Sequence, residues 1–431
     1  MTTDPGYRAA VARLAREVIK PLPWNFVERP WGGDRIRAYK GLAPLPDQKK
    51  LTGMGLGEAF EIAACPSDPE ARAHPSIVPL AGGTRMDLAT LLEAGAEAIL
   101  GSEFAAAFGR ELPLLPKTLD VAELLSVQAH PEGNTEVYVI IEAEPGASIR
   151  LGFRRDIERT SYARMLEAGR RDQRALLEYT RPEAGGGALQ AVLAENFQRR
   201  DLAAGALTAD LRPLLKPGCD AGALARRLAA LKSLYWRVLD SLNEVPVRAG
   251  DVIYNATPAR LLGPGGRPSA EVHALGNPEG REILALEIRR PGPTYRAWDH
   301  VRFPLREVAV DKALDALNLR ATAPEEFRVT PRPLPRRQGV YESVVSDAFV
   351  LEHLRPPPGG AVAVTAPPAH TLHAIAGSAE IRTPEGRFLA TLAAGESALI
   401  PVGLGDYRVA ARAAATEVIK VTVPLACDSE S

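Results

Sequence analysis

Short apolar runs, each broken by Gly or Pro, dominate the first 152 residues and return after residue 246. Apolar runs of this length that end at turn residues are typical of β-strands. They predict short strands in GEAFEIA (57–63), LPLLPKTLDV (112–121), LLSVQAHP (124–131), EVYVIIEAEPGASI (136–149), VRAGDVIYNA (247–256) and REILALEIRRPG (281–292).

Helical periodicity appears in three other places. Residues 1–20 predict a short amphipathic helix that ends before Pro21, and residues 86–110 are rich in Ala and Leu and also predict helices. From Asp156 to about Asn243 the chain is helical in pattern and rich in Arg, and Asp220 suits a helix N-cap. After it, apolar residues at spacings of three and four fall on one helix face: Leu224, Leu228, Leu231, Leu234, Val238 and Leu242.

The C-terminal part again predicts short strands at regular spacing, over residues 339–425, which favours a sandwich or barrel. Residues 313–338 are polar and Pro-rich and predict a linker. The pattern therefore indicates a mainly β protein with two β-barrels and a helical insertion in the first. The expected domains are 1–152 with 246–312, the insertion 153–245, the linker 313–338 and the C-terminal barrel 339–431.

Composition limits the functions that fit this fold. With 46% hydrophobic and 24% charged residues among 431, the chain is globular rather than disordered. A formal net charge of −1 gives no general attraction to nucleic acid or to an acidic membrane, so neither is an expected partner. Cys65, Cys219 and Cys427 are too far apart for a cysteine metal motif or a disulfide framework. No secretory signal or membrane span is recognisable, and a cytoplasmic location is expected.

The most informative polar cluster lies in SVQAHPEGNTEVYVI (126–140). Gln128 and His130 are two residues apart, so on a strand they point to the same face, and Glu136 follows after a turn that contains Pro131 and Gly133. An amide oxygen, an imidazole and a carboxylate are suitable ligands for zinc or a similar divalent ion. Taken alone, the pattern fits an ordinary polar turn more often than a metal site.

Several segments in order along the chain resemble the type I mannose-6-phosphate isomerases of the cupin superfamily. They are RPWGG (29–33), GEAFEIA (57–63), LLEAGAEAILG with FGRELPLLPK (91–117), the segment LPLLPKTLDVAELLSVQAHPEGNTE (112–136) and EILALEIRRPGPTYRAWD (282–299). The matches cover about residues 24–150 and 246–310, whereas the C-terminal barrel matches only in its general strand pattern. The resemblance implies two cupin-like (jelly-roll) barrels. In the second, His370 and His373 are three residues apart and would face opposite sides of a strand, so this barrel is expected to be degenerate and structural.

The resemblance implies one Zn²⁺ per chain, held by Gln128, His130, Glu136 and a second His, with another divalent ion as the alternative. At the turn where the family usually has that His, this chain has Ala259. His273 instead stands before the EILALEI strand, 23 residues ahead of Arg296, whereas Ala259 stands 37 residues ahead. His273 is therefore the expected fourth ligand, and a loop His beside a three-ligand or inactive site is the alternative.

Substrate-binding residues also follow from the resemblance. Arg296 matches an active-site Arg, and a guanidinium can bind phosphate or stabilise the charge of an enediolate. Lys117 and Ser126 match positions that line the same pocket, although Lys117 alone would pass for a solvated strand-end lysine. Asn134 stands where many family members have a Lys, and because Asn carries no charge it puts rate and substrate in doubt.

The implied activity is a metal-dependent aldose–ketose isomerase that interconverts mannose 6-phosphate and fructose 6-phosphate through a cis-enediol, as in GDP-mannose biosynthesis. Two alternatives stay open: another sugar-phosphate isomerase or epimerase on the same scaffold, and a non-catalytic cupin that binds a sugar phosphate. The expected partner is a hexose 6-phosphate. A monomer is the expectation, but neither the oligomeric state nor the general base follows from the sequence.

Overall fold

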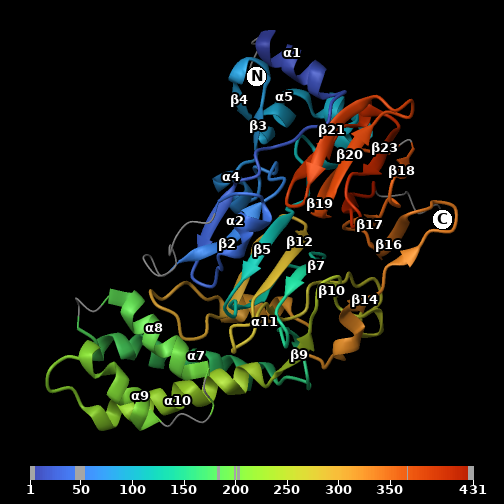
Figure 1. Ribbon diagram of the computed structural model, residues 1–431. Coiled ribbons are helices and arrows are strands. Elements are labelled where there is room, and N and C mark those ends of the chain that lie inside the picture. The colour runs from blue at the N-terminus through green and yellow to red at the C-terminus, as the bar shows by residue number, and fades with distance from the viewer. Residues whose placement is uncertain are drawn as a thin grey trace.

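The computed structural model describes residues 5–43, 54–181, 185–198, 200, 204–365 and 367–425. The protein is mainly β, as expected, with several sheets and with helices at both ends of the molecule (Figure 1). Four larger sheets form two pairs, and the chain passes from the first pair to the second near residue 330.

The first pair consists of a seven-stranded and a five-stranded antiparallel sheet. In spatial order the larger sheet contains β1 (Phe26–Arg29), β2 (Gly55–Phe60), β5 (Lys117–Val121), β12 (Ile283–Arg289), β7 (Glu136–Ala143), β10 (Val252–Asn255) and β14 (Arg328–Val329). The smaller sheet contains β13 (Tyr295–Trp298), β6 (Val127–Ala129), β11 (His273–Ala274), β8 (Ser148–Phe153) and β9 (Leu242–Pro246).

Strand β7 shows how the two faces of the larger sheet are used. Tyr138 and Ile140 point inward and share a core with Ile149 and Leu151 of the smaller sheet, so the two sheets pack face to face. The alternate residues Val137 and Val139 belong to a different core cluster. Side chains alternate along a strand, so a strand that is apolar on both faces must be covered on both sides. Strand β7 is covered in this way, by one core cluster on each face.

The second pair consists of a six-stranded and a four-stranded sheet. The larger contains β15 (Arg332–Pro333), β16 (Val340–Val345), β17 (Val350–Leu354), β24 (Glu417–Thr422), β19 (His370–Ala376) and β22 (Ser397–Ile400). The smaller contains β18 (Ala361–Val364), β23 (Tyr407–Ala411), β20 (Ser378–Arg382) and β21 (Phe388–Ala393). One core cluster takes side chains from both of these sheets.

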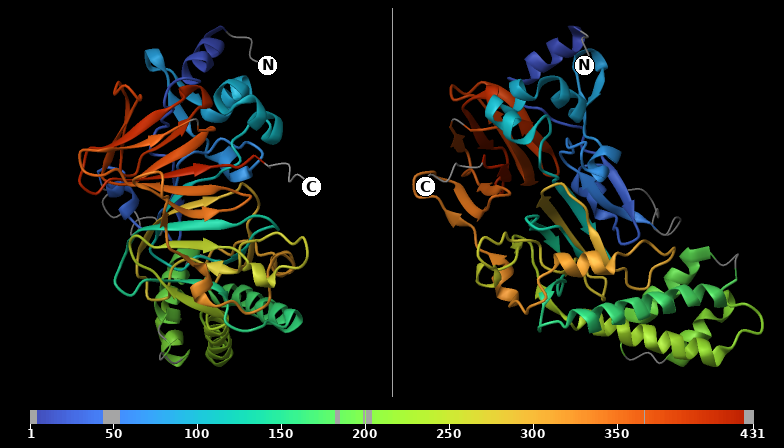
Figure 2. Two further views of the ribbon diagram at one scale, coloured as in Figure 1. Left: turned by 90° about the vertical axis from the view of Figure 1, so that its right-hand side faces the viewer. Right: turned by 180° about the vertical axis from the view of Figure 1, so that it is seen from behind.

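One apolar cluster joins the two pairs of sheets. Val137 and Leu286 from the outer face of the first pair share it with Leu351 and Val421 of the second pair. Helix α5 (Leu88–Leu100) and helix α1 (Pro5–Leu14) add residues to the same cluster and lie together at one end of the molecule (Figure 2). Helix α1 is shorter than expected, and Ile19 instead pairs with Leu399 of β22.

Four of the described helices lie at the opposite end, between β8 and β9 along the chain, where the sequence pattern is helical (Figure 1). They are α7 (Arg159–Tyr179), α8 (Gly185–Gln198), α9 (Ala204–Leu211) and α10 (Ala221–Leu239). Asp220 caps α10 by accepting from the backbone N–H groups of Gly222 and Ala223, as its position predicts. The predicted apolar face is buried through Val238, but Leu242 was wrongly included, because α10 ends at Leu239 and Leu242 begins β9.

The expected linker 313–338 contains regular structure. Helix α11 (Val310–Ala316) overlaps its start, β14 pairs with β10 of the first pair, and β15 pairs with β16 of the second. Short helices and strands complete the described chain: α2 (Arg35–Tyr39), α4 (Pro69–Ala73), β3 (Ile77–Pro79), β4 (Arg85–Asp87), α6 (Ser102–Phe108) and 3₁₀ turns at Ala81–Gly83, Arg212–Leu214, Ala259–Leu261, Pro324–Phe327 and Val402–Leu404.

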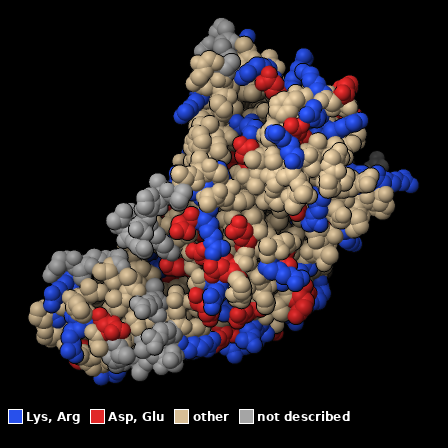
Figure 3. Space-filling view, in the orientation of Figure 1, with Lys and Arg blue, Asp and Glu red and all other residues tan. Residues whose placement is uncertain are grey.

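Charged side chains of both signs are interspersed on the face shown in Figure 3, as the near-zero net charge suggests. None of the described helices has the length and apolar character needed to cross a bilayer. Cys65 and Cys219 are free thiols, and Cys427 lies outside the described residues.

A buried polar contact ties the N-terminal segments to the second pair of sheets. The Lys40 ammonium donates to Glu61 Oε1 at 2.6 Å and to the Gly395 carbonyl at 2.7 Å. Ser397 Oγ donates to Glu61 Oε2 at 2.9 Å, and Thr118 Oγ1 of β5 donates to Oε1 at 2.5 Å. Since Lys40 and Glu61 are both buried, each charge depends on the other.

We predict that Glu61→Ala destabilises the protein by about 3–5 kcal/mol, because the Lys40 ammonium would stay buried without its carboxylate. The measurement is the free energy of unfolding in urea. The control is Glu93→Ala, which removes the largely exposed partner of Arg110 and should cost less than about 1 kcal/mol. Equal effects of the two substitutions would show that the Lys40–Glu61 pair does not hold the two parts together.

Candidate metal centre

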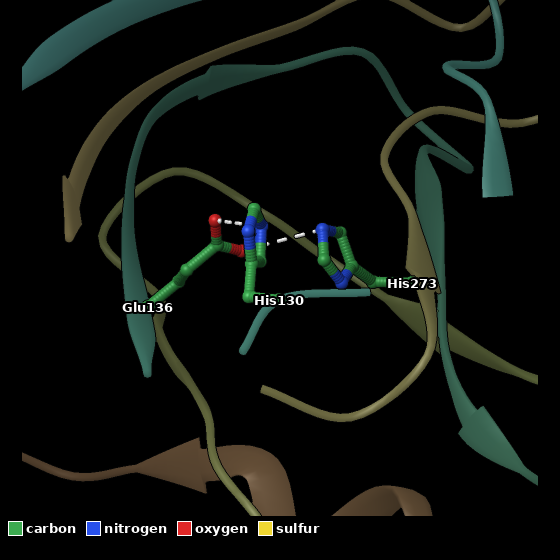
Figure 4. Close-up of side chains that lie close together, drawn as sticks. All are labelled: His130, Glu136 and His273. Atoms are coloured by element: carbon green, nitrogen blue, oxygen red, sulfur yellow. Dashed lines mark ion pairs between the residues drawn. The ribbon is translucent and has the colours of Figure 1, made fainter. Parts of the chain in front are cut away.

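His130, Glu136 and His273 converge on one point between the two sheets of the first pair (Figure 4). Their candidate ligand atoms all lie within 4.8 Å of one another, and all three residues are buried. His130 Nε2 is 2.7 Å from Glu136 Oε1, and His273 Nε2 is 3.4 Å from Glu136 Oε2. The two imidazole rings face each other, with centroids 5.2 Å apart. Two nitrogens and a carboxylate in this arrangement could hold a metal ion.

Strand register explains why these residues meet. His130 directly follows β6, and Glu136 begins β7 after a tight turn in which Gly133 has a φ of +78°. In the smaller sheet His273 pairs with Gln128, so the two side chains lie on the same face. The loop between β10 and β11 is closed by a hydrogen bond from the Thr257 N–H to the backbone carbonyl of Ser269, at 2.8 Å. The chain then continues into β11.

The outer nitrogen of each histidine is held by a backbone carbonyl. His130 Nδ1 is 3.2 Å from the Pro293 carbonyl, and His273 Nδ1 is 2.9 Å from the Glu271 carbonyl. A proton on Nδ1 satisfies each carbonyl and leaves Nε2 as a lone-pair donor toward the centre. Both rings are therefore oriented as metal ligands require.

Glu136 is surrounded by donors. Its Oε2 accepts from the Tyr138 hydroxyl and from Asn255 Nδ2, the latter at 3.4 Å, and Arg289 Nε is 3.9 Å from Oε1. Burial by itself would raise the pKa of the Glu136 carboxyl, but the neighbouring His130 and His273 rings and Arg289 hold its pKa well below the usual range. The carboxylate is thus kept ionised.

Two features of the centre fit a bound cation. His130 Nε2 is buried, and although it lies near Glu136 it has no hydrogen-bond partner of acceptable geometry among the described residues. Burial lowers the pKa of His273 despite the opposing charge of Glu136, so the ring is neutral at neutral pH. A neutral imidazole and a carboxylate are the forms that bind divalent metals.

Gln128 and Arg296 lie next to His273 on neighbouring strands of the smaller sheet. Gln128 pairs with His273 on one side and with Arg296 on the other, which places all three on one face. Gln128 Nε2 donates to Ser126 Oγ at 2.8 Å, and Arg296 Nε donates to the same oxygen at 3.3 Å. Within the described part of the chain, no carboxylate lies within 4.0 Å of the Arg296 guanidinium, so Arg296 can receive an anion.

Lys117 is less available than expected. Its ammonium is buried, donates to Glu70 at 2.9 Å, lies 3.7 Å from Glu58 and sits 4.7 Å from the centre of the Phe60 ring. Burial would lower the pKa of Lys117, but the two carboxylates raise it, and Lys117 in turn lowers the pKa of Glu70 to about 2. The lysine charge is already compensated before any phosphate arrives.

Asn134 is also buried and turned to the backbone. Its Nδ2 donates to the Arg290 carbonyl at 3.2 Å, and its Oδ1 has no partner among the described residues. The other histidines belong to separate surroundings: His370 contacts Tyr407 at 2.6 Å, His373 contacts Ser397 at 2.8 Å and His353 contacts Glu417 at 2.7 Å.

Sequence reasoning missed three polar residues on the inner face of the larger sheet. Arg289 pairs with Glu136 in the register of β12 and β7, and Glu287 pairs with both Tyr138 and Lys117. Burial raises the pKa of Glu287 to about 8, and the charge of Glu136 adds to this effect. Tyr138 could have been found, since it is two residues from Glu136, whereas Arg289 and Glu287 needed the strand pairing.

Residues 70–145 match the family model of the phosphomannose isomerase type I catalytic domain, which confirms the resemblance expected from the sequence. Curated protein sequences give no significant match. Three solved structures have the same fold. Mannose 6-phosphate isomerase from Bacillus subtilis is 18% identical, with a TM-score of 0.59 over 94% of this chain and 98% of that one.

The other two are a variant of phosphomannose isomerase from Salmonella typhimurium and a mannose 6-phosphate isomerase bound with zinc and yttrium. Each is 17% identical, with a TM-score of 0.57 over 94% of this chain and 99% of that one. At this identity the solved structures show the fold alone, and the family model matches the part of the chain that contains His130 and Glu136.

We predict that His273→Ala lowers the affinity of the protein for a divalent ion by at least about tenfold, because one of three converging ligand groups is lost. The measurement is elemental analysis after equilibration with zinc and removal of free ion. His74→Ala, which changes a partly exposed histidine outside the centre, should keep the metal content of the unchanged protein. Full zinc content in His273→Ala would remove His273 from the site.

Proposed function

We propose that the protein is a zinc-dependent mannose-6-phosphate isomerase, in which Gln128, His130, Glu136 and His273 hold the ion. The observation that carries the proposal is the buried convergence of His130, Glu136 and His273, with the guanidinium of Arg296 on the same sheet and without a carboxylate partner among the described residues. Each pair of sheets would then be a cupin-like barrel, with the metal in the first and the second structural. A cytoplasmic location and one Zn²⁺ per chain belong to the same proposal.

The reaction moves a proton between C1 and C2 of the sugar through a cis-enediol. The bound ion supplies Lewis-acid polarisation of the sugar oxygens, which lowers the free energy of the enediolate. Arg296, fixed by Ser126 and by the Glu307 carbonyl at 3.2 Å, lies beside Gln128 and would stabilise negative charge on the sugar or its phosphate. Ser126 could in turn donate to a phosphate oxygen.

Glu287 is the group best suited to transfer the proton. It faces the same interior as Tyr138, and its carboxylate is 3.6 Å from Arg289 Nε, which also approaches Glu136. A carboxyl with its pKa raised to about 8 can both accept and donate a proton near neutral pH. Under this proposal Glu287 would fill the role of general base that the sequence left open, since Asn134 cannot act as a base.

Two other functions use the same site. Asn134 donates to a backbone carbonyl. The Lys117 ammonium is already paired with carboxylates, so fewer cations are available to bind the substrate phosphate than the resemblance implies. This favours, as the second candidate, an isomerase or epimerase that acts on a different sugar phosphate. A non-catalytic cupin that binds a sugar phosphate would have the same metal but no proton transfer.

One experiment separates these functions. The zinc-loaded protein is incubated in D₂O with mannose 6-phosphate and, separately, with other hexose and pentose phosphates. Products and deuteration at C1 of the ketose and C2 of the aldose are followed by NMR. Conversion of mannose 6-phosphate to fructose 6-phosphate, with deuterium at C1 of the ketose and at C2 of the aldose formed in the reverse reaction, supports the proposal. Turnover of another sugar phosphate alone supports the second candidate. Metal-loaded protein that gives neither product nor exchange with any substrate contradicts both enzymatic functions.

We expect Arg296→Lys to lower kcat/KM for mannose 6-phosphate by about 10²-fold or more, because a lysine keeps the charge but loses the planar donor fork. Steady-state kinetics measure the effect, and elemental analysis should show an unchanged metal content. Arg320→Lys, at an exposed position, is the control and should leave kcat/KM unaltered. Unchanged kinetics in Arg296→Lys would place the substrate elsewhere.

For Glu287→Gln we expect kcat to fall by about 10²- to 10⁴-fold while KM changes little, because the carboxyl that exchanges the proton is lost and the shape is kept. The rate of deuterium incorporation at C1 of fructose 6-phosphate should fall in parallel. Glu244→Gln, at an exposed position, is the matched control. If Glu287→Gln keeps the normal exchange rate, another group is the base.

A further inference from the structure

A second polar cavity lies between the helical insertion and the segment that follows β13. It has a volume of about 210 Å³ and is lined by Arg170, Gln173 and Arg174 of α7 and by residues of the segment 299–308. None of the residues that converge at the metal centre lines it. The insertion helix α7 packs beside α11, which directly follows this segment (Figure 2).

Arginine is concentrated in the walls of this cavity. Four guanidinium groups line it, from Arg170, Arg174, Arg302 and Arg306, against the carboxylates of Asp299 and Glu307. The formal excess is two positive charges. Asp299 accepts from Arg306 Nε at 2.7 Å and lies 3.4 Å from Arg302, so it fixes two of the arginines rather than neutralising all four.

Arg170 and Arg174 have no acidic partner among the described residues, and Arg302 keeps one unsatisfied donor besides its contact with Asp299. Arg170 donates to the Val308 carbonyl at 3.1 Å, and neither Arg170 nor Arg174 forms an ion pair within the described ranges. Arg302 is 6% exposed, and its Nε is buried without a hydrogen-bond partner among the described residues. An unsatisfied buried donor in a positively charged cavity indicates a missing anionic acceptor.

We propose that this cavity binds a phosphate group, either as inorganic phosphate or as the phosphate of a small monoester. Guanidinium groups match the oxygens of phosphate in charge and in geometry, and several of them around one anion favour a group with more than two oxygens. The volume is below that of a site for a drug-sized molecule, which excludes a fully enclosed nucleotide.

The cavity is connected to the metal centre through the backbone of residues 307–309. Arg170 donates to the Val308 carbonyl. The Arg296 guanidinium donates to the Glu307 carbonyl at 3.2 Å, and the backbone carbonyl of Arg296 accepts from the Ala309 N–H at 2.8 Å. Phosphate that draws Arg170 into the cavity would release Val308 and change the position of Arg296. This regulatory consequence rests on the proposed function, whereas the binding site itself does not.

Calorimetric titration of the zinc-loaded full chain with inorganic phosphate, and separately with glycerol 3-phosphate, tests the proposal at constant ionic strength. The unchanged protein should bind at one site apart from the metal centre, and the tighter of the two ligands identifies the source of the phosphate. The double variant Arg170→Gln/Arg174→Gln should bind about tenfold or more weakly. Arg171→Gln, an exposed neighbour on α7, should bind normally.

A second measurement separates this site from the substrate site. Phosphate should change kcat for the sugar phosphate without competing with it, and the double variant should lose that effect while keeping its KM. Equal phosphate binding by the double variant and Arg171→Gln, at equal thermal stability, would overturn the site. Strict competition between phosphate and sugar phosphate would overturn its separation from the metal centre. If no sugar phosphate is turned over, the titration alone decides.

Discussion

The buried charge of Glu136 determines how the two sheets of the first pair must be aligned. A carboxylate without solvent is costly unless cations and donors surround it. Here two imidazoles, the Tyr138 hydroxyl, an amide and the Arg289 guanidinium approach it from five different strands or their ends. Because these groups come from both sheets, the charge can be satisfied only when the sheets are paired in the correct register.

The rest of the chain holds that register. The larger sheet is apolar on its outer face as well as its inner face, and the second pair of sheets covers that outer face through residues such as Leu351 and Val421. The Lys40–Glu61 contact adds a polar link at the same junction and reaches β5 through Thr118. The second pair of sheets therefore supports the site without contributing a residue to the cluster of His130, Glu136 and His273.

The sequence predicted what depends on local pattern and on the resemblance. The strands from 112 to 149, the insertion helices and the Asp220 cap follow from short-range spacing, and His273 was placed by its distance from Arg296. Spacing did not predict the end of α10 before Leu242, because an apolar residue fits a strand as well as a helix. The pairing of Lys117 with Glu58 and Glu70, and the approach of Arg289 to Glu136, depend on contacts between distant segments. Those contacts are set by register and have no local signal.

X-ray absorption at the zinc edge of the zinc-loaded protein tests the central claim most directly, since it reports the atoms around the ion without reference to activity. A single site with imidazole scattering from two histidine nitrogens at about 2.0–2.1 Å, together with oxygen and without sulfur, is the spectrum that this geometry predicts. A sulfur shell near about 2.3 Å, or zinc without imidazole scattering, would contradict it.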